Sequence, residues 1–462
     1  MNMSNERQLA RSPGITYQEL LDTDTHPVPE VLRIEAPQYL GCDDIPTDRY
    51  TTKEFHDLEV KMLWKRVWQF ACREEDIPNV GDHTIYDIAG MSFLIVRGSD
   101  RSIKAYPNAC LHRGRRLKDY DGNCAELRCA FHAFAWTIDG ALKHVPARWD
   151  FPHIVDEEWS LPELKVGTWA GFVFINMDPN CEPLEAFLGG IVDDFKVWDL
   201  ASGFTEAHVA KVVPANWKVA QEAFSEAYHV SGTHPQILTY LGDTNSQIDI
   251  WENYSRVITP GGTPSPLIPN EPTQEEMLRA MLDTRLDAAT PITLAEGQTM
   301  RALGADLSRK RWRPVVGDRV DKMSDAEMMD SLDYTVFPNF HPWGAYNRIV
   351  YRFRPNGNDH RTAIMECLFI SPFTGERPKP AEVHWLRDDE VFSDATELGM
   401  LGKVFDQDLF NMPNVQRGLE STFKKGVTLA NYQESKVRWI QQKLGDWVTS
   451  ETPPRSIPRS LS

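Results

Sequence analysis

Two cysteine-histidine pairs lie close together in the first third of the chain. Cys110 is followed two residues later by His112, and after sixteen intervening residues Cys129 is followed three residues later by His132. Thiolate sulfur and imidazole nitrogen both bind zinc and iron. The spacing therefore allows two interpretations. One is a structural zinc site, and the other is a [2Fe-2S] cluster in which two thiolates hold one iron and two neutral imidazoles hold the other.

A second group of metal-binding side chains lies in the middle of the chain. On a helix, Glu226 and His229 project from the same face, and His234 can return to His229 after the break that Ser231-Gly232 predicts. Two histidines and one carboxylate are the ligands of non-haem Fe(II) enzymes that activate oxygen. The alternative is a pair of ordinary buried histidines, because two histidines alone are weak evidence.

The elements around the first group are short strands. From Thr51, the segment TTKEFHDLEVKMLWKRVWQFA predicts an amphipathic helix. Five β-like runs with turn residues between them follow: HTIYDIAG, MSFLIVRG, DRSIKAYPNAC, HAFAWTIDGAL and GFVFINMD. We expect a small antiparallel β domain over roughly residues 68–178, with both cysteine-histidine pairs in its loops. Residues 1–50 are polar and proline-punctuated, and we predict an arm there.

The second part of the chain is mixed in its patterns. The segment PANWKVAQEAFSEAYHVSGTHP predicts a helix that ends at Ser231-Gly232. Two more helices are predicted around TQEEMLRAMLDTRL and after the capping box that Ser324 opens, and strands at RIVYRFRP and TAIMECLFISPF. A closing helix carries apolar residues on one face: Val437, Ile440, Leu444 and Trp447. We expect the tail, residues 450–462, to be disordered.

Composition restricts the class of protein. The net charge of -18 argues against nucleic acid or an anionic membrane as the main partner, and no run of eighteen apolar residues occurs. The first residues lack the apolar core of a signal peptide, and seven cysteines do not form an even disulfide framework. We therefore expect a cytoplasmic protein with reduced thiols. No glycine-rich dinucleotide motif follows a strand, so the sequence predicts no dinucleotide site in this chain.

The motif CLHRG followed by CAFH resembles the Rieske motif of the Rieske non-haem iron oxygenases, large (α) subunit, the aromatic ring-hydroxylating dioxygenase family. By this resemblance Cys110, His112, Cys129 and His132 bind a Rieske [2Fe-2S] cluster. The family usually continues the second pair with Gly-Trp, where this chain has Ala133-Phe134. That difference concerns the packing of the loop rather than the ligands.

Two later segments extend the resemblance. The segment NWKVAQEAFSEAYHVSGTH is similar to the family's iron-binding segment, which implies that His229 and His234 are iron ligands and that Glu226 links the two metal centres. The segment DQDLFNMPNVQRGL resembles the family's late segment, which implies Asp408 as the third ligand of the mononuclear iron, with Asp406 as the fallback. An acid usually precedes that aspartate in the family, and here the position holds Gln407.

The resemblance implies an α+β protein with two domains. An antiparallel Rieske β domain with its leading helix occupies residues 51–178, and a helix-grip (START-like) catalytic domain with an antiparallel sheet occupies residues 179–449. The implied function is the terminal oxygenase of a multicomponent system. It takes electrons from a separate ferredoxin or flavin reductase, and uses O2 to hydroxylate or dealkylate an aromatic or other apolar substrate. A homotrimer is expected, with or without a separate β subunit.

Two other functions fit parts of the sequence. A Rieske-type electron carrier would use the cluster alone, although about 280 residues with their own ligand set follow the cluster domain. A zinc-stapled module would bind an apolar ligand without chemistry. The metal distinguishes the three, since the carrier would hold two irons per chain, the oxygenase three, and the zinc module would be colourless.

Overall fold

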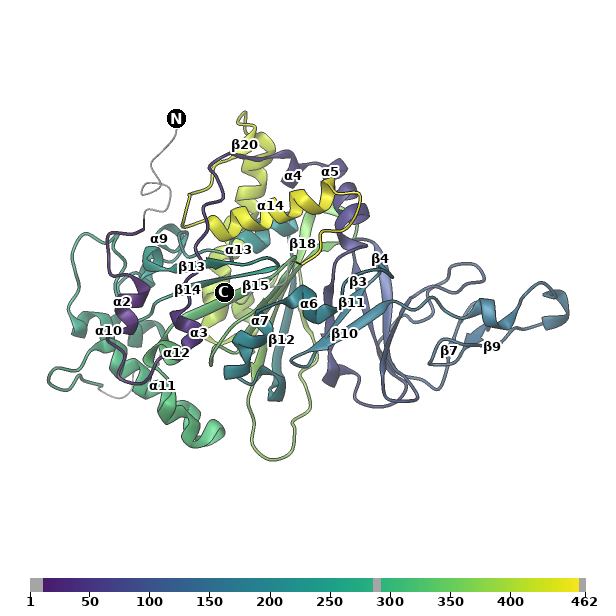
Figure 1. Ribbon diagram of the computed structural model, residues 1–462, viewed down its shortest axis with the longest axis horizontal. Helices are drawn as coiled ribbons and strands as arrows, with labels where there is room; N and C mark the ends of the chain where they lie inside the picture. The colour runs from purple at the N-terminus through teal and green to yellow at the C-terminus, as the bar shows by residue number, and fades with distance from the viewer. Residues whose placement is uncertain (1–10, 286–291, 457–462) are drawn as a thin grey trace.

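The computed structural model describes residues 11–285 and 292–456 of the chain. Figure 1 shows a smaller β domain beside a larger domain built around one sheet. This arrangement confirms the predicted α+β fold class, with the β domain first in the chain. All five predicted runs of the β domain contain strands.

The β domain consists of three small antiparallel sheets. Their orders are β5-β4-β3-β6, β10-β11-β2 and β7-β8-β9. The bounds are β2 Gln69–Arg73, β3 Asp82–Ile88, β4 Met91–Arg97, β5 Ile103–Pro107, β6 Gly122–Asn123, β7 Leu127–Arg128, β8 Ala135–Trp136, β9 Leu142–His144, β10 Lys165–Trp169 and β11 Phe172–Asn176. The sheet β7-β8-β9 lies at the end of the molecule remote from the larger domain (Figure 1).

One eight-stranded sheet organises the larger domain. Its order is β13-β14-β15-β16-β17-β18-β12-β19, and every neighbouring pair is antiparallel except β12 with β19, so the expected antiparallel sheet has one parallel edge. The bounds are β12 Phe204–Val213, β13 Gln247–Ile250, β14 Tyr254–Thr259, β15 Ser331–Val336, β16 Phe340–Pro342, β17 Ile349–Asn356, β18 Asp359–Ser371 and β19 His384–Leu386. Both strands predicted by sequence are present, as β17 and β18.

Helices pack against this sheet. α8 contacts β17 and β18, α13 contacts β12, and α14 contacts β13 and β14. The bounds are α6 Leu184–Leu188, α7 Ile191–Asp194, α8 Trp217–Glu222, α9 Val230–Thr233, α10 Gln274–Arg285, α11 Met300–Val316, α12 Asp325–Met329, α13 Met400–Ser421 and α14 Ser435–Thr449. The closing helix is confirmed as α14, whose four predicted apolar residues are buried, and the capping box at Ser324 is present at α12. α11 and α13 were not predicted.

The leading helix is shorter than its pattern predicts. α4 (Asp48–Thr51) and α5 (Lys53–Glu59) precede a π-helical turn over Val60–Trp64, after which the chain enters β2. The helix packs on the larger domain, because the Trp64 ring lies 5.1 Å from that of Trp217 in α8. Beside them the buried Lys218 ammonium donates to the buried Glu59 carboxylate over 2.6 Å.

The described part of the N-terminal arm also packs on the larger domain. It contains α2 (Tyr17–Leu21), α3 (Glu30–Arg33) and β1 (Ile45–Pro46), and β1 pairs with β20 (Gly426–Val427). Arg301 of α11 forms ion pairs of 3.0 Å with Asp24 of the arm and 2.6 Å with Asp330. The arm is therefore held by specific contacts to residues distant in sequence.

The C-terminal tail is packed where it is described. Ser456 donates through its hydroxyl to Glu182 over 2.9 Å and accepts from the Asn253 amide over 2.6 Å. Side-chain hydrogen bonds therefore link the end of the described tail to the larger domain, where the sequence predicts disorder. Residues 457–462 lie outside the described residues.

Three charged side chains join the two domains. In β17, the Arg352 guanidinium donates to the carbonyls of Phe70 and Ala71 in β2 over 2.9 and 2.8 Å, and Arg354 donates to a carbonyl in β3. Both arginines also donate to Glu366 of β18, over 2.6 to 2.8 Å. Burial would raise the pKa of Glu366, but the charges of the two arginines outweigh it and hold the pKa well below its usual value.

Candidate metal centres

The two cysteine-histidine pairs lie in two loops of the same construction. In each loop the cysteine carbonyl accepts from the amide four residues on, over 2.9 Å at Cys110 and 3.0 Å at Cys129. In each loop the cysteine amide also donates to the carbonyl five residues on, over 2.8 Å. The fourth residue after each cysteine, Gly114 or Ala133, has a positive φ of 75° or 61°. The two loops thus share one backbone conformation around their cysteines, while the histidine lies one residue later in the second loop.

The four side chains pair by type. Cys110 and Cys129 are free thiols with only 4% and 2% of their surface exposed, and the His112 and His132 ring centroids are 4.8 Å apart. Burial raises the pKa of the Cys110 thiol, so a thiolate there needs a neighbouring cation. His112 Nδ1 is buried and has no hydrogen-bond partner among the described residues, which leaves it free as a ligand.

This pairing fits two irons better than one zinc. A tetrahedral zinc site draws four ligand atoms to about 2.0 to 2.3 Å from one point. Within the described ranges, the group of three side chains that could hold a single metal ion is His229, His234 and Asp408, whose ligand atoms lie within 4.8 Å of one another. The four side chains of the β domain do not form such a group, and two thiolates with two imidazoles are the donor set of a cluster with two thiolates on one iron and two imidazoles on the other.

Aromatic and charged side chains surround the two loops. Phe134, which stands where the family has tryptophan, is buried and stacks on the His112 ring at 4.6 Å between centroids. Arg115 and Arg116 form ion pairs of 2.6 and 3.1 Å with aspartates of the same domain, and the Arg113 guanidinium lies 5.4 Å from the Phe131 centroid. Most of the local positive charge is thus already paired within the domain.

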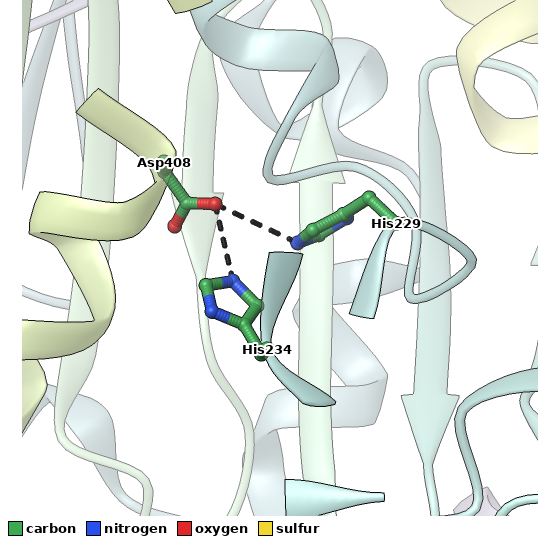
Figure 2. Close-up of side chains that lie close together, drawn as sticks. All are labelled: His229, His234 and Asp408. Atoms are coloured by element: carbon green, nitrogen blue, oxygen red, sulfur yellow. Dashed lines mark hydrogen bonds and ion pairs between the residues drawn. The ribbon is translucent and has the colours of Figure 1, made fainter. Parts of the chain in front are cut away.

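The second centre lies between the helices of the larger domain. The Asp408 Oδ1 atom is 3.1 Å from His234 Nε2 and 3.8 Å from His229 Nε2, and Figure 2 shows both imidazoles directed at this carboxylate. Asp408 comes from α13, and His234 follows α9. His234 and Asp408 are buried, whereas a quarter of the His229 side chain is exposed. The three side chains could therefore hold one metal ion.

The alternative carboxylate lies elsewhere. Asp406 accepts a hydrogen bond from the backbone amide of Ser393 over 3.2 Å and is not part of the group around the histidines. On geometry, Asp408 is the third member of the set.

The segment that carries His229 is not the helix that the sequence predicts. α8 ends at Glu222 rather than at Gly232, and a turn separates it from α9. The Ser225 hydroxyl donates to the Gln221 carbonyl over 2.9 Å, and Glu226 Oε2 accepts from the His229 amide over 2.9 Å. These side chains compete with the backbone hydrogen bonds that would continue the helix.

Each histidine is oriented by a second hydrogen bond. His229 Nδ1 lies 2.8 Å from Glu226 Oε1, and His234 Nδ1 lies 2.8 Å from Gln407 Oε1. The Gln236 amide donates to the same Gln407 oxygen over 2.8 Å, which fixes that oxygen as an acceptor. Both Nε2 atoms are therefore free to bind a metal, since each Nδ1 carries the proton. Sequence reasoning predicted Glu226 as a partner of His229 but left the partner of His234 open, although Gln407 adjoins Asp408.

The neighbouring carboxylates change the acidity of His229. Burial lowers its pKa, but the hydrogen bond and charge of Glu226, with the charge of Asp408, outweigh burial and raise the pKa. Glu226 itself is nearly buried, with 9% of its side chain exposed. The Glu226 and Asp408 carboxylates together favour a cation at His229, either a proton or a metal.

Comparison with known proteins identifies the two parts of the chain. A model of the Rieske [2Fe-2S] domain matches residues 67–154, and a model described as the ring hydroxylating alpha subunit (catalytic domain) matches residues 198–450, or 253 of 462 residues. The chain belongs to the ring-hydroxylating α-subunit family. The two cysteine-histidine loops of this chain lie in the range matched by the Rieske model, and His229, His234 and Asp408 lie in the range matched by the catalytic-domain model.

Curated relatives in this family are named oxygenase subunits. The chain is 31% identical over 202 residues to the carnitine monooxygenase oxygenase subunit of Escherichia coli (strain K12), which is 41% of this chain and 52% of that one. It is 29% identical over 256 residues to the biphenyl dioxygenase subunit alpha of Metapseudomonas furukawaii, 51% of this chain and 54% of that one. The matched part thus spans about half the length of these relatives.

Solved structures share the fold. A quaternary ammonium Rieske monooxygenase superposes with a TM-score of 0.63 at 20% identity, covering 88% of this chain and 95% of that chain. Naphthalene 1,2-dioxygenase from Rhodococcus sp. bound to indole superposes with a TM-score of 0.60 at 18% identity, covering 88% and 95%. In this ring-hydroxylating α subunit, no helix of the described residues is long and apolar enough to cross a membrane.

Proposed function

We propose that this chain is the terminal oxygenase of a multicomponent Rieske system. The observation that carries the proposal is the presence of two distinct ligand sets in one chain. Cys110, His112, Cys129 and His132 would hold the [2Fe-2S] cluster, and His229, His234 and Asp408 would hold a mononuclear Fe(II). When bound, the cluster supplies single electrons and the mononuclear iron supplies a site at which O2 is activated.

The residues around the second set prepare it for this task. Glu226 and Gln407 accept the Nδ1 protons of the two histidines, so both Nε2 atoms face Asp408. Two neutral imidazoles and one carboxylate keep the charge of the site low and leave positions for O2 beside an organic substrate. The partial exposure of His229 supports an open side for these ligands.

The placement of the two sets supports a homotrimer. The second loop joins β7 to β8, at the end of the molecule remote from the helices that carry the triad (Figure 1). Electrons would therefore pass from the cluster of one subunit to the triad of the next. Glu226, whose carboxylate contacts His229, would link that histidine to His112 or His132 of a second copy across the boundary.

The donors and the substrate class follow from the same proposal. A flavin reductase in the cytoplasm, with or without a ferredoxin, would oxidise NAD(P)H and reduce the cluster, and the assembly would form with or without a separate β subunit. The substrate would be a small organic molecule, aromatic or otherwise mainly apolar, that is hydroxylated or dealkylated. The relatives act on chemically different substrates by their names, so the pocket decides between them.

Metal analysis and product analysis test the proposal together. Purified protein should be red-brown with three irons per chain, and reaction under 18O2 with a reductase should place labelled oxygen in the product. Asp408→Ala should lose one iron per chain and turnover while keeping the colour, whereas Asp406→Ala should keep both. Two irons in the native chain would support an electron carrier instead, and a colourless zinc protein would support a binding module.

A further inference from the structure

One face of the eight-stranded sheet lies beneath the triad. The Phe224 ring, which follows α8, lies 5.2 and 5.4 Å from the Tyr351 and Phe353 rings of β17. Phe405, one helical turn before Asp408 on α13, lies 5.7 Å from Tyr351. Phe405 thus joins Tyr351 to the turn of α13 that carries Asp408.

Polar side chains continue the same face on the neighbouring strands. His341 of β16 is the register partner of Tyr351, and Trp343 just after β16 forms a bridge with Asp333 of β15. The Trp343 ring lies 5.8 Å from Tyr351, and His341 lies 5.3 Å from Phe353. Trp343 therefore contacts Tyr351 and is also the bridge partner of Asp333.

Three polar atoms of this group have no hydrogen-bond partner among the described residues. They are Asp333 Oδ1, His341 Nε2 and Trp343 Nε1, and all three are buried. Asp333 and His341 have 3% and 0% of their surface exposed. Buried polar groups without a partner are costly and rare, so each one requires an explanation. A ligand whose polar group reaches this face would supply the missing partners.

The charges of the group are already balanced. The other Asp333 oxygen accepts from the buried Lys436 ammonium of α14 over 2.6 Å, so the carboxylate is neutralised by its own domain. His341 Nδ1 lies 2.8 Å from the Thr335 hydroxyl and 3.8 Å from Asp333 Oδ1, beyond hydrogen-bond distance, and burial lowers the pKa of His341, which keeps the ring uncharged. The unpaired set therefore offers a donor at Trp343 and an acceptor at Asp333 with no net charge.

We infer that this face recognises an uncharged hydrogen-bonding group on the substrate, such as a hydroxyl, a carboxamide or a ring N–H, attached to an aromatic or apolar body. The inference rests on the proposed oxygenase function and specifies its substrate. A quaternary ammonium group has no N–H to donate and no acceptor, so it satisfies none of the three atoms. A carboxylate would face the Asp333 oxygen, with the nearby ammonium already engaged.

Binding measurements on the full-length, iron-loaded protein test this inference. The probes are naphthalene, 2-naphthol and 2-naphthoate, which share one ring system, and carnitine. We expect 2-naphthol to bind at least tenfold more tightly than the other three, since one buried hydrogen bond corresponds to about that factor. Equal affinities for naphthalene and 2-naphthol, or tightest binding of carnitine or 2-naphthoate, would overturn the inference.

Variants assign the effect to the residues. Trp343→Phe keeps the aromatic surface and removes the indole N–H, so 2-naphthol should bind about tenfold more weakly while naphthalene is unchanged. Trp385→Phe alters a tryptophan of β19 that is 48% exposed, and should change neither affinity. The ratio of the two affinities on one sample removes any loss due to misfolding. A 2-naphthol preference that survives Trp343→Phe would overturn the assignment.

The same samples separate this inference from the proposed function. Iron and colour are measured on each protein before the titration. Protein without the mononuclear iron or the cluster would contradict the proposed function itself. Protein that holds three irons and oxygenates naphthalene, yet shows no preference for 2-naphthol, would leave the proposed function standing and refute the inference about Asp333, His341 and Trp343.

Discussion

The contact between Glu226 and His229 allows a quantitative prediction. The two carboxylate oxygens accept from the His229 amide over 2.9 Å and from its ring Nδ1 over 2.8 Å. Glu226→Gln keeps one oxygen acceptor but presents an NH2 group to the other donor, so one hydrogen bond to a charged acceptor is lost. Such a bond contributes about 1.5 to 3 kcal/mol, which corresponds to about 10- to 100-fold in activity. Removing second-sphere partners of metal ligands has effects of about the same size.

The assay compares product formation with metal content in the same preparation. Glu226→Gln should retain three irons per chain and a reducible cluster, because all proposed ligands remain, and should lose product formation about 10- to 100-fold. Glu222→Gln is the matched control. Burial raises the pKa of Glu222 to about 7, and its contacts are Tyr50 and Gln441 rather than a histidine. Unchanged turnover in Glu226→Gln, or equal losses in both variants, would refute the reasoning.

Two further predictions concern stability. Ala133 has a left-handed φ of 61° and Gly114 has 75° at the equivalent place of the other loop, so Ala133→Gly should raise and Gly114→Ala should lower the free energy of unfolding, each by about 1 kcal/mol, in calorimetry of the holoprotein. Opposite signs would show that the loops tolerate this conformation differently. Burial raises the pKa of Asp24 from its usual 3.8 to about 6. Protonated Asp24 therefore adds to the free energy of unfolding below about pH 4, and this contribution, about 3 kcal/mol at most, is lost as the pH rises through 6. The Tm of Asp24→Asn should therefore rise relative to that of the native protein as the pH increases from 4.5 to 7. Parallel profiles of Tm against pH for the two proteins would contradict this.

The sequence predicts the candidate ligands because they lie in short local motifs. Each cysteine-histidine loop takes its shape from a few consecutive residues, and each predicted strand is recognised from the apolar and turn residues of one short run. The contact of Glu226 with His229 was also expected, but for the wrong reason. Residues three apart come close both on a helix and in a turn. The hydrogen bond from the Ser225 hydroxyl to the Gln221 carbonyl favours the turn here.

What the sequence does not predict depends on contacts between distant residues. α11 has no clear apolar stripe, because buried ion pairs such as those of Arg301 and Arg309 hold it in place. The arm is fixed by partners some three hundred residues away, including Asp325, which accepts from Thr25. Gln407 looks like an ordinary departure from a family pattern until the fold places its oxygen beside His234.

The clamp of Arg352 and Arg354 between the domains bears on how such proteins can be recombined. Both guanidinium groups donate to main-chain carbonyls of the β domain, and these acceptors exist whatever side chains that domain carries. A cluster domain transplanted from a relative would therefore meet the same hydrogen-bond donors, provided that its strands keep their path and that it carries aromatic rings where Phe70 and Tyr86 lie beneath the two guanidinium groups. A β domain expressed without its partner would conversely leave those carbonyls to water, and the catalytic domain alone would expose the two guanidinium groups that face Glu366. The joint thus constrains the backbone shape of the β domain and two of its aromatic positions.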